Sequence, residues 1–225
     1  MPAKETPILT PLNRILSPLL NLHPPNTPPD LYASALHHFT SIPWCAALLH
    51  PSSPPGQVIP FIPQCFNPLT PQHDQFVGAT LASHPRGLRH MLSFFYHAHD
   101  AALRDPNHFV REVHTLFSLA DGLSGYRGLI HGGVTATMMD EAMGTVNEIN
   151  TALGKHGLVH QRSSVTAELD VKFLRPVPAP GVVCVTAWTE GIEGRKTRMR
   201  CEVKDGEGTV LARGASTWIA LKPSL

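Results

Sequence analysis

The order of predicted elements in the second half of the chain limits its fold more than any other feature. From 165 to 173 apolar and polar residues alternate, which is the period of a half-buried strand. Three further strands are predicted at 182–188, 197–204 and 210–221, and the short segments TEGIEGRK and DGEGT join them as hairpins. Parallel neighbours in a sheet need long crossover segments. A doubly wound sheet is therefore excluded, and we expect an antiparallel sheet.

A strand, a glycine-rich loop and a helix precede this sheet. The strand is predicted at 111–120, the loop at 121–133, and the helix from Gly132 to about Ile149. On a helical wheel an arc of about 120° is apolar, and it holds Val134, Met138, Ala142, Val146 and Ile149. We therefore predict an α+β protein in which an antiparallel sheet packs on one long helix.

The N-terminal part of the chain has a different composition. Residues 1–80 contain 16 of the 22 prolines but only five Asp, Glu, Lys or Arg residues. Proline restricts φ and breaks helices, so extended coil is predicted, above all at 23–30, 50–56 and 59–64. One short helix is predicted after an Asp30 cap, and its apolar side holds Leu31, Ala35 and Phe39.

A second helix is predicted between this extension and the first strand. Apolar residues recur at helical spacing from 86 to about 104, and Asp105-Pro106 ends the pattern. We accordingly divide the chain into a proline-rich extension with short helices, 1–85, and a folded domain, 86–225. The extension retains many apolar residues, so we expect it to drape over the domain rather than to be disordered.

Composition excludes several classes of protein. Lys and Arg number 18 against 17 Asp and Glu, so the near-neutral charge does not favour nucleic acid or an acidic membrane. No uncharged apolar run approaches the roughly 20 residues of a membrane span, and the N-terminus does not resemble a signal peptide. Four cysteines without metal-binding spacing indicate a reducing compartment. We expect a cytoplasmic protein, although mitochondrial import is not excluded.

The loop and start of the long helix carry the strongest chemical signal. Glycines before a helix leave free backbone N–H groups that favour negative charge. Asp140 lies on the helix in a stripe of small residues that includes Gly133 and Thr137, where a ligand or another backbone can approach closely. P-loop, Rossmann and nucleophile-elbow patterns are absent from the sequence. An oxyanion site with a carboxylate and a solvated polar face remain equally supported by these residues.

A family resemblance separates these two interpretations. His131-Gly132-Gly133, with Asp140 nine positions after the histidine, resembles the HGG(x)6D signature of hotdog-fold acyl thioesterases of the PaaI-like and THEM-type branch. The runs SVTAELDVKFLRPVP and EGIEGRK are similar to that branch as well. The resemblance covers about 110–222. It implies a hotdog fold, in which an antiparallel sheet wraps around one long central helix.

The resemblance also implies roles for individual residues. Asp140 would act as general base or nucleophile, the Gly132 N–H would polarise the thioester carbonyl, Thr166 would orient the carboxylate or water, and His131 would shape the loop. Substrate-binding candidates are Gly133, Thr137, Arg175, Arg195 and Lys196, the last three as contacts for coenzyme A or carrier phosphates unless they are solvated charges. The implied substrate is an acyl-CoA or carrier-bound acyl group, the implied assembly at least a homodimer, and no cofactor or metal is expected.

The sequence departs from the family pattern in places, and these departures support alternative functions. Ser124, Gly125 and Tyr126 stand where many relatives place an amide side chain, and the extension is large. A non-catalytic hotdog dimer that binds acyl thioesters or a protein is the second hypothesis, and a hotdog dehydratase or hydratase the third. The pair His97/His99 invites a metal interpretation, but positions i and i+2 of a helix point apart and the sequence contains no HExxH motif, so we expect surface histidines there and at His156/His160.

Overall fold

The computed structural model describes residues 8–9, 15–16, 27–51, 57–69, 76–97 and 100–222. The α-helices are α1 (Pro29–Thr40), α2 (Pro43–Leu49), α3 (Asp100–Arg104) and α4 (Gly132–Ala152), with 3-10 turns η1 (Gln64–Phe66) and η3 (Asp121–Leu123) and a π-helix, η2 (Phe76–Leu81). The strands are β1 (Ile8–Leu9), β2 (Ile15–Leu16), β3 (Gln57–Phe61), β4 (Leu88–His97), β5 (Glu112–Leu119), β6 (Ser124–Tyr126), β7 (Leu129–Ile130), β8 (Ser164–Phe173), β9 (Gly181–Glu193), β10 (Lys196–Lys204) and β11 (Val210–Ala220).

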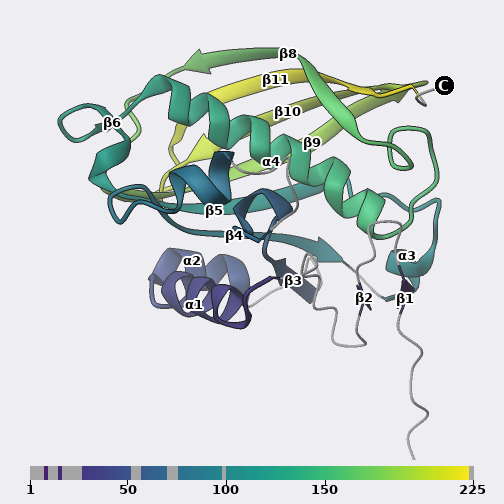
Figure 1. Ribbon diagram of the computed structural model, residues 1–225, viewed down its shortest axis with the longest axis horizontal. Helices are drawn as coiled ribbons and strands as arrows, with labels where there is room; N and C mark the ends of the chain where they lie inside the picture. The colour runs from purple at the N-terminus through teal and green to yellow at the C-terminus, as the bar shows by residue number, and fades with distance from the viewer. Residues whose placement is uncertain are drawn as a thin grey trace, which may run out of the picture.

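An antiparallel sheet wraps around α4, as predicted. Its seven strands run in the order β3-β4-β5-β9-β10-β11-β8, and Figure 1 shows β8 to β11 on one side of the helix and β5 and β4 on the other. Met138, Ala142, Val146 and Ile149 of the predicted apolar arc are all buried. The predicted helix, the strand before it and the four strands after it are confirmed.

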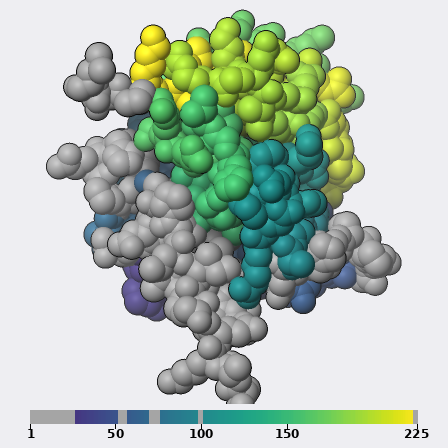
Figure 2. All heavy atoms as spheres, turned by 90° about the vertical axis from the view of Figure 1, so that its right-hand side faces the viewer, coloured from purple at the N-terminus to yellow at the C-terminus, as the bar shows by residue number. Residues whose placement is uncertain are grey.

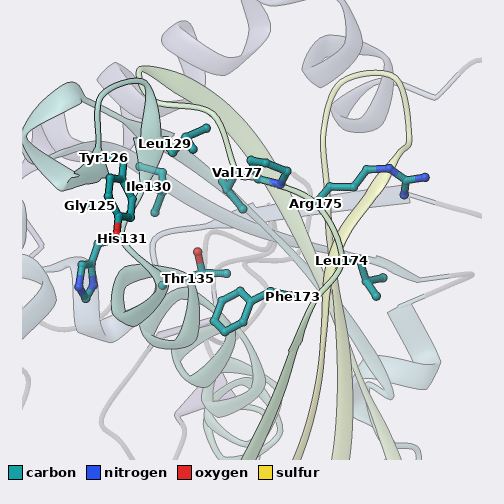
Figure 3. A pocket seen from close by; sticks show the side chains of 12 residues that line it. Gly125, Tyr126, Leu129, Ile130, His131, Thr135, Phe173, Leu174, Arg175 and Val177 are labelled. Carbon is teal, nitrogen blue, oxygen red and sulfur yellow. The ribbon is translucent and has the colours of Figure 1, made fainter.

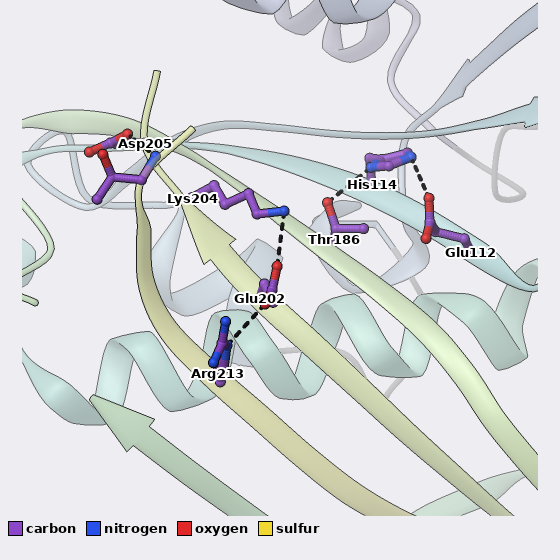
Figure 4. Close-up of polar contacts among 8 residues, drawn as sticks. Glu112, His114, Thr186, Glu202, Lys204, Asp205 and Arg213 are labelled. Carbon is purple, nitrogen blue, oxygen red and sulfur yellow. Dashed lines mark hydrogen bonds and ion pairs between the residues drawn. The ribbon is translucent and has the colours of Figure 1, made fainter. Parts of the chain in front are cut away.

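The outer face of the sheet is polar along β10, where buried and exposed residues alternate. Met199 and Cys201 are buried while Arg198 and Arg200 are exposed. Polar partners cross several strands on this face (Figure 4): the His114 ring contacts Glu112 and Thr186, and Glu202 pairs with Lys204 and Arg213. Such pairs satisfy long side chains on a solvated face but add little stability.

The segment predicted as an amphipathic helix from 86 to 104 is mainly a strand, β4, followed by the short α3. Strand β4 is covered on both faces. Ser93 bonds Thr115 on the side that packs on α4, whereas His90 stacks on His38 of α1 on the other side. Its Met91, Leu92, Phe94 and Phe95 are fully buried. A strand that is buried on both faces is apolar throughout and lacks period-two alternation. The apolar residues of β4 therefore recurred at intervals that resemble those of a helix.

The N-terminal part contains more regular structure than its prolines suggested. The predicted short helix is confirmed as α1, with Ala35 and Phe39 buried, although it begins at Pro29 instead of after an Asp30 cap. Extended coil was wrong for α2 and β3. Pro43 occupies the first turn of α2, where the missing N–H costs nothing, and Pro60 lies in β3, an edge strand that tolerates proline.

Some expectations for this region stay open. Residues 1–7, 10–14, 17–26 and 52–56, which include most of the proline-rich motifs, lie outside the described residues. The division at residue 85 remains a prediction, although β3 and α1 both pack against β4. Within the described residues no helix combines the length and apolar character needed to cross a membrane.

A β-bulge alters the predicted alternation in β8. Thr217 pairs with Glu168 and Trp218 with Thr166, so Ala167 is the extra residue. Residues directly opposite each other share a face. Because Trp218 contacts α4 at Gly144, Thr166 also faces the helix, and beyond the bulge Leu169, Val171 and Phe173 do so. Thr166 therefore lies on the same face as the apolar residues, and not opposite them as the simple alternation predicted.

Candidate active site

Asp140 is held on the middle of α4 by its neighbour on β8. The Thr166 hydroxyl donates a hydrogen bond of 2.8 Å to Oδ1 of Asp140. The carboxylate is half-buried, and the second oxygen has no partner in the part of the chain that the structure describes. One oxygen is thus fixed while the other is available to a ligand.

Burial and hydrogen bonding act on Asp140 in opposite directions. Desolvation raises the pKa of the carboxyl, and the Thr166 bond offsets part of that rise, so the pKa lies above that of an ordinary aspartate. Because the pKa is higher in the folded protein than in the unfolded chain, folding is favoured while the carboxyl is neutral. This contribution to the stability of the protein is lost as pH rises through the folded-state pKa. The protein therefore keeps Asp140 at a cost in stability at neutral pH, which is typical of functional carboxylates.

The N-terminus of α4 presents a free backbone donor. His131 is the N-cap, and its Nδ1 accepts a 3.0 Å hydrogen bond from the Gly133 N–H. The N–H groups of Val134 and Thr135 both bond the His131 carbonyl. No described residue accepts from the N–H of Gly132, which is exposed at the positive end of the helix. His131 thus shapes the loop and leaves Gly132 as the donor for a ligand.

A cavity of about 500 Å³ opens beside this N-terminus. In Figure 3 Tyr126, Thr135 and Phe173 surround the hollow, and the His131 ring points away from it. Phe173 closes toward Gly132, where an added Cβ would stand 3.3 Å from Cζ. Tyr126 and Phe173 are 81% and 57% exposed, so the walls of the cavity are unusually apolar for a surface. Exposed apolar rings of this kind can pack against an acyl group or against a second subunit.

The other predicted substrate-binding residues do not form one cluster. The Thr137 hydroxyl donates to the Gly133 carbonyl at 3.0 Å. Arg175 lies at the 500 Å³ cavity, and its guanidinium donates to the Val210 carbonyl. Arg195 bonds the Ala220 carbonyl in the β9–β10 turn. The neighbouring Lys196 is in register with Ile219 and hence Val165, about 30 Å along β8 from Arg175. One chain cannot bring all three cations to one phosphate.

Two residues that line the cavity at the α4 N-terminus were not among the functional candidates predicted from the sequence. Thr135 and Phe173 were treated as helix and strand residues, because nothing in the periodicity distinguishes a cavity wall from a core residue. Tyr126 was noted only as a replacement for an amide. Its wall position depends on the small β6–β7 sheet, which pairs Tyr126 with Leu129.

The sequence comparisons agree with this architecture. The profile described as the thioesterase superfamily matches residues 127–212, from the turn before β7 into β11. Over these residues the chain is similar to the thioesterase superfamily. Its α+β architecture, a sheet wrapped on one long helix, is the hotdog fold. Asp140, the α4 N-terminus and Thr166 all lie inside the matched segment.

Individual relatives each match about half of the chain. Acyl-coenzyme A thioesterase THEM4 of Bos taurus is 35% identical over 109 residues, covering 48% of this chain and 40% of that protein. Verlamelin biosynthesis protein B of Lecanicillium sp is 26% identical over 127 residues, 48% of this chain and 55% of that one. The solved structure of conserved protein PA5202 from Pseudomonas aeruginosa is 28% identical, with a TM-score of 0.42, over 49% and 81% of the two chains. The chain spans about half the length of the curated relatives it matches.

Proposed function

We propose that the protein hydrolyses an acyl thioester, with Asp140 as the group that activates water or attacks the acyl carbon. The observation that carries this proposal is the half-buried Asp140 carboxylate, whose Oδ1 accepts from Thr166 while its other oxygen is free. The free Gly132 N–H at the helix start supplies the second element of the reaction, a donor for a developing oxyanion.

The general-base route accounts for every atom. Asp140 takes a proton from water as the water oxygen bonds the acyl carbon, and the carbonyl π electrons move to oxygen, where the Gly132 N–H stabilises the charge. The tetrahedral intermediate then collapses with cleavage of the carbon–sulfur bond, and the proton on Asp140 passes to the thiolate. Thr166 is a positioning residue, because its contact is with the carboxylate and not with the acyl group.

Two copies of the chain are needed to assemble the proposed site. Gly132 and Asp140 are eight residues apart on α4, which separates them by about 12 Å along the axis. An N–H bonded to the carbonyl oxygen and a base acting on the same carbonyl carbon must lie within a few ångströms of each other. We therefore propose a homodimer in which Gly132 of one subunit and Asp140 of the other face one thioester.

Acyl-coenzyme A is the substrate class that we propose. The name of the Bos taurus relative, acyl-coenzyme A thioesterase, supports it. The apolar cavity at the helix N-terminus offers a place for the acyl group, and Arg175 at its rim can pair with a phosphate. A carrier-bound acyl group presents the same thioester and is the competing substrate.

The proposal is tested by measuring thiol release from a panel of acyl-CoA and acyl-carrier thioesters. We expect turnover by the wild type and a loss of at least about a hundredfold in Asp140→Asn, the range typical of a lost general acid–base group. Asp170→Asn, on the exposed outer face of β8, is the matched control and should retain activity. Undiminished turnover in Asp140→Asn would refute the assigned role, and acyl-CoA binding without turnover by the wild type would favour the non-catalytic alternative.

A further inference from the structure

A second cavity lies at the other end of α4. Its volume is about 210 Å³, and its walls come from four segments: residues 109–111, the last turns of α4, the link after α4 and the end of β9. Figure 2 looks onto this end of the molecule, where residues near 110 (teal), the α4 link (green) and the β9–β10 turn (yellow-green) meet. The lining includes Phe109, Arg111, Asn150, His160, Thr189 and Ile192.

His160 is the polar group that this cavity leaves unsatisfied. We expected a surface histidine, but the residue is only 3% exposed. Neither ring nitrogen has a hydrogen-bond partner among the described residues, and its ring lies 5.1 Å from that of Phe109. Burial lowers the pKa of His160 to about 4, so at neutral pH the imidazole offers one N–H donor and one acceptor. Buried polar atoms normally have a hydrogen-bond partner, so the two nitrogens mark this cavity as a place where a polar molecule can bind.

Asn150 builds the wall and does not serve as a ligand contact. Its Nδ2 donates to the carbonyls of Val110 and Val146, and its Oδ1 accepts from the Val110 N–H at 2.8 Å. These bonds tie the strand entering β5 to α4, and they use the hydrogen-bonding capacity of the amide. The position of Phe109 and Arg111 beside the cavity is therefore fixed by the backbone.

Arg111 supplies the charge of the cavity. Its carbonyl accepts from the Thr189 N–H at 2.9 Å, which secures the backbone, while its guanidinium forms no hydrogen bond or ion pair with any described residue. Most other exposed arginines on this sheet have carboxylate partners, as Arg200 does with Glu190 at 2.7 Å. An exposed, unpaired guanidinium next to a buried neutral imidazole favours an anionic ligand with a hydrogen-bonding edge.

We propose that this cavity binds a small, flat organic anion. Its oxyanion group pairs with the Arg111 guanidinium, its body packs on the Phe109 ring, and a polar atom bonds the His160 imidazole. The cavity volume limits the ligand to a small molecule, and the Phe109 ring in its wall offers an aromatic face on which a flat ring can pack. Asn150 is ten residues beyond Asp140 on α4, about 15 Å along the axis, so the site is separate from the proposed reaction centre.

Three probes dissect the site: benzoate, benzamide and inorganic phosphate. Benzoate carries both the ring and the charge, benzamide the ring alone and phosphate the charge alone. Binding to the full-length protein is measured by calorimetry, and histidine-ring ¹⁵N NMR reports the His160 nitrogens. We expect benzoate to bind at least about tenfold more tightly than either partial probe and to shift the His160 resonances. Unshifted His160 resonances with all three probes into the millimolar range would overturn the proposal.

Matched variants show which contacts produce the binding. Arg111→Gln is expected to remove the preference for benzoate over benzamide, whereas Arg127→Gln, in the exposed β6–β7 turn, should retain it. His160→Gln should weaken benzoate binding, and His156→Gln, on the exposed part of the same link, should not. Thermal unfolding verifies that each variant is folded. Equal benzoate affinity in wild type and Arg111→Gln would overturn the proposal that the Arg111 guanidinium binds the oxyanion group of the ligand.

A titration with coenzyme A separates this site from the thioester site. We expect coenzyme A to leave the His160 resonances unshifted, because the proposed reaction centre lies on another part of α4. Displacement of benzoate by coenzyme A would overturn the proposal of a separate site and assign the cavity to part of the substrate. The binding experiments do not depend on turnover, so failure of the proposed thioesterase activity leaves this inference testable.

Discussion

The indole ring of Trp218 packs directly against Gly144, one turn beyond Asp140 on α4. A Cβ built on Gly144 would stand only 2.9 Å from Cη2 of the ring. Trp218 is also the cross-strand partner of Thr166, and its Nε1 donates to the Ser216 hydroxyl at 2.9 Å. The same tryptophan therefore sets the distance between α4 and the edge of the sheet where Thr166 meets Asp140.

Gly144→Ala is predicted to destabilise the protein despite the higher helix propensity of alanine. The substitution gains up to about 1 kcal/mol from propensity, but overpacking against a fixed ring costs about 1–3 kcal/mol. We expect a net loss of about 1 kcal/mol in the free energy of unfolding, measured with urea. In a Trp218→Leu background the same change should become stabilising, because the clash is gone. Equal effects in both backgrounds would contradict the steric explanation.

Gly132→Pro is predicted to remove the oxyanion donor with little damage to the helix. Gly132 is the first residue of α4, a position that favours proline, and the extended His131 before it (φ −61°, ψ 135°) is compatible with a following proline. Gly132→Ala keeps the N–H and adds the same Cβ toward Phe173. We expect kcat to fall by on the order of a hundredfold or more in the proline variant relative to the alanine variant.

The proline variant also tests whether the proposed site is shared between subunits. A mixture of Gly132→Pro and Asp140→Asn chains, each inactive alone, should regain activity after subunit exchange, because one site in each mixed dimer has both intact residues. Two sites each built within a single chain would give no recovery. A strictly monomeric protein in solution would likewise exclude the shared site.

The elements that the sequence predicted well are those whose buried residues recur at a clear period. Strand β10 shows a clear period of 2, because solvent covers its other face. Helix α4 was recognised from the helical spacing of its buried apolar residues, although none of its residues after Gly133 is exposed. Strand β4 was misassigned because both of its faces are covered, one of them by α1. The prolines of β3 and α2 argued against regular structure, yet each lies where its missing N–H is not needed.

The candidate site was less visible in the sequence than the fold. The motif placed Asp140 and Gly132 on one helix, but composition and spacing alone left a solvated face as an equal interpretation. The bulge at Ala167, which turns Thr166 toward Asp140, has no signal in the alternation of β8. His160 lies in the link after α4, where burial depends on contacts with distant segments and not on local periodicity.

Thr166→Val is predicted to shift the pH dependence of turnover. The Thr166 hydrogen bond lowers the pKa of Asp140, so its loss should raise that pKa further. The reaction needs the ionised carboxylate, and activity therefore falls as pH drops through this pKa. We expect the acid limb of kcat/KM to move to higher pH in Thr166→Val and to stay near the wild-type position in Thr166→Ser. An unchanged limb in both variants would remove Thr166 from this role.

His90 is predicted to make the protein lose stability in mild acid. Its ring stacks on that of His38 at 4.3 Å, and burial, with help from the charges of His38 and Arg89, lowers its pKa to about 4. An unfolded histidine has a pKa of about 6.5. The stability from the neutral ring is complete above that value and is lost as pH falls toward 4.

Urea unfolding between pH 7 and pH 4.5 measures this effect. We expect the free energy of unfolding to fall less steeply with pH in His90→Gln than in the wild type, and His108→Gln, at an exposed position, should follow the wild type. Burial also lowers the pKa of His160 and of His38, so both add to the slope that remains in His90→Gln. Identical pH slopes for wild type and His90→Gln would show that α1 packing does not depend on this ring.

The π-helix η2 is predicted to limit the acyl groups that the proposed enzyme accepts. Val77 and Leu81 of η2 close an apolar cavity beside α4, where Thr137 and Glu141 flank the turn that holds Asp140. The space left is about 10 Å³, close to the minimum for a single water. An acyl chain that entered along this face would therefore meet η2.

Leu81→Ala enlarges this space without removing β3, which a deletion of the whole extension would take away. We expect the ratio of kcat/KM for long over short acyl-CoA to rise in Leu81→Ala, together with a loss of stability smaller than the about 2–5 kcal/mol of a fully buried leucine, because Leu81 is only partly buried. Leu69→Ala is the matched control, since Leu69 also precedes the domain and is 60% exposed. If the chain-length profile of Leu81→Ala equals that of Leu69→Ala, η2 does not border the acyl group and its packing on α4 is purely structural.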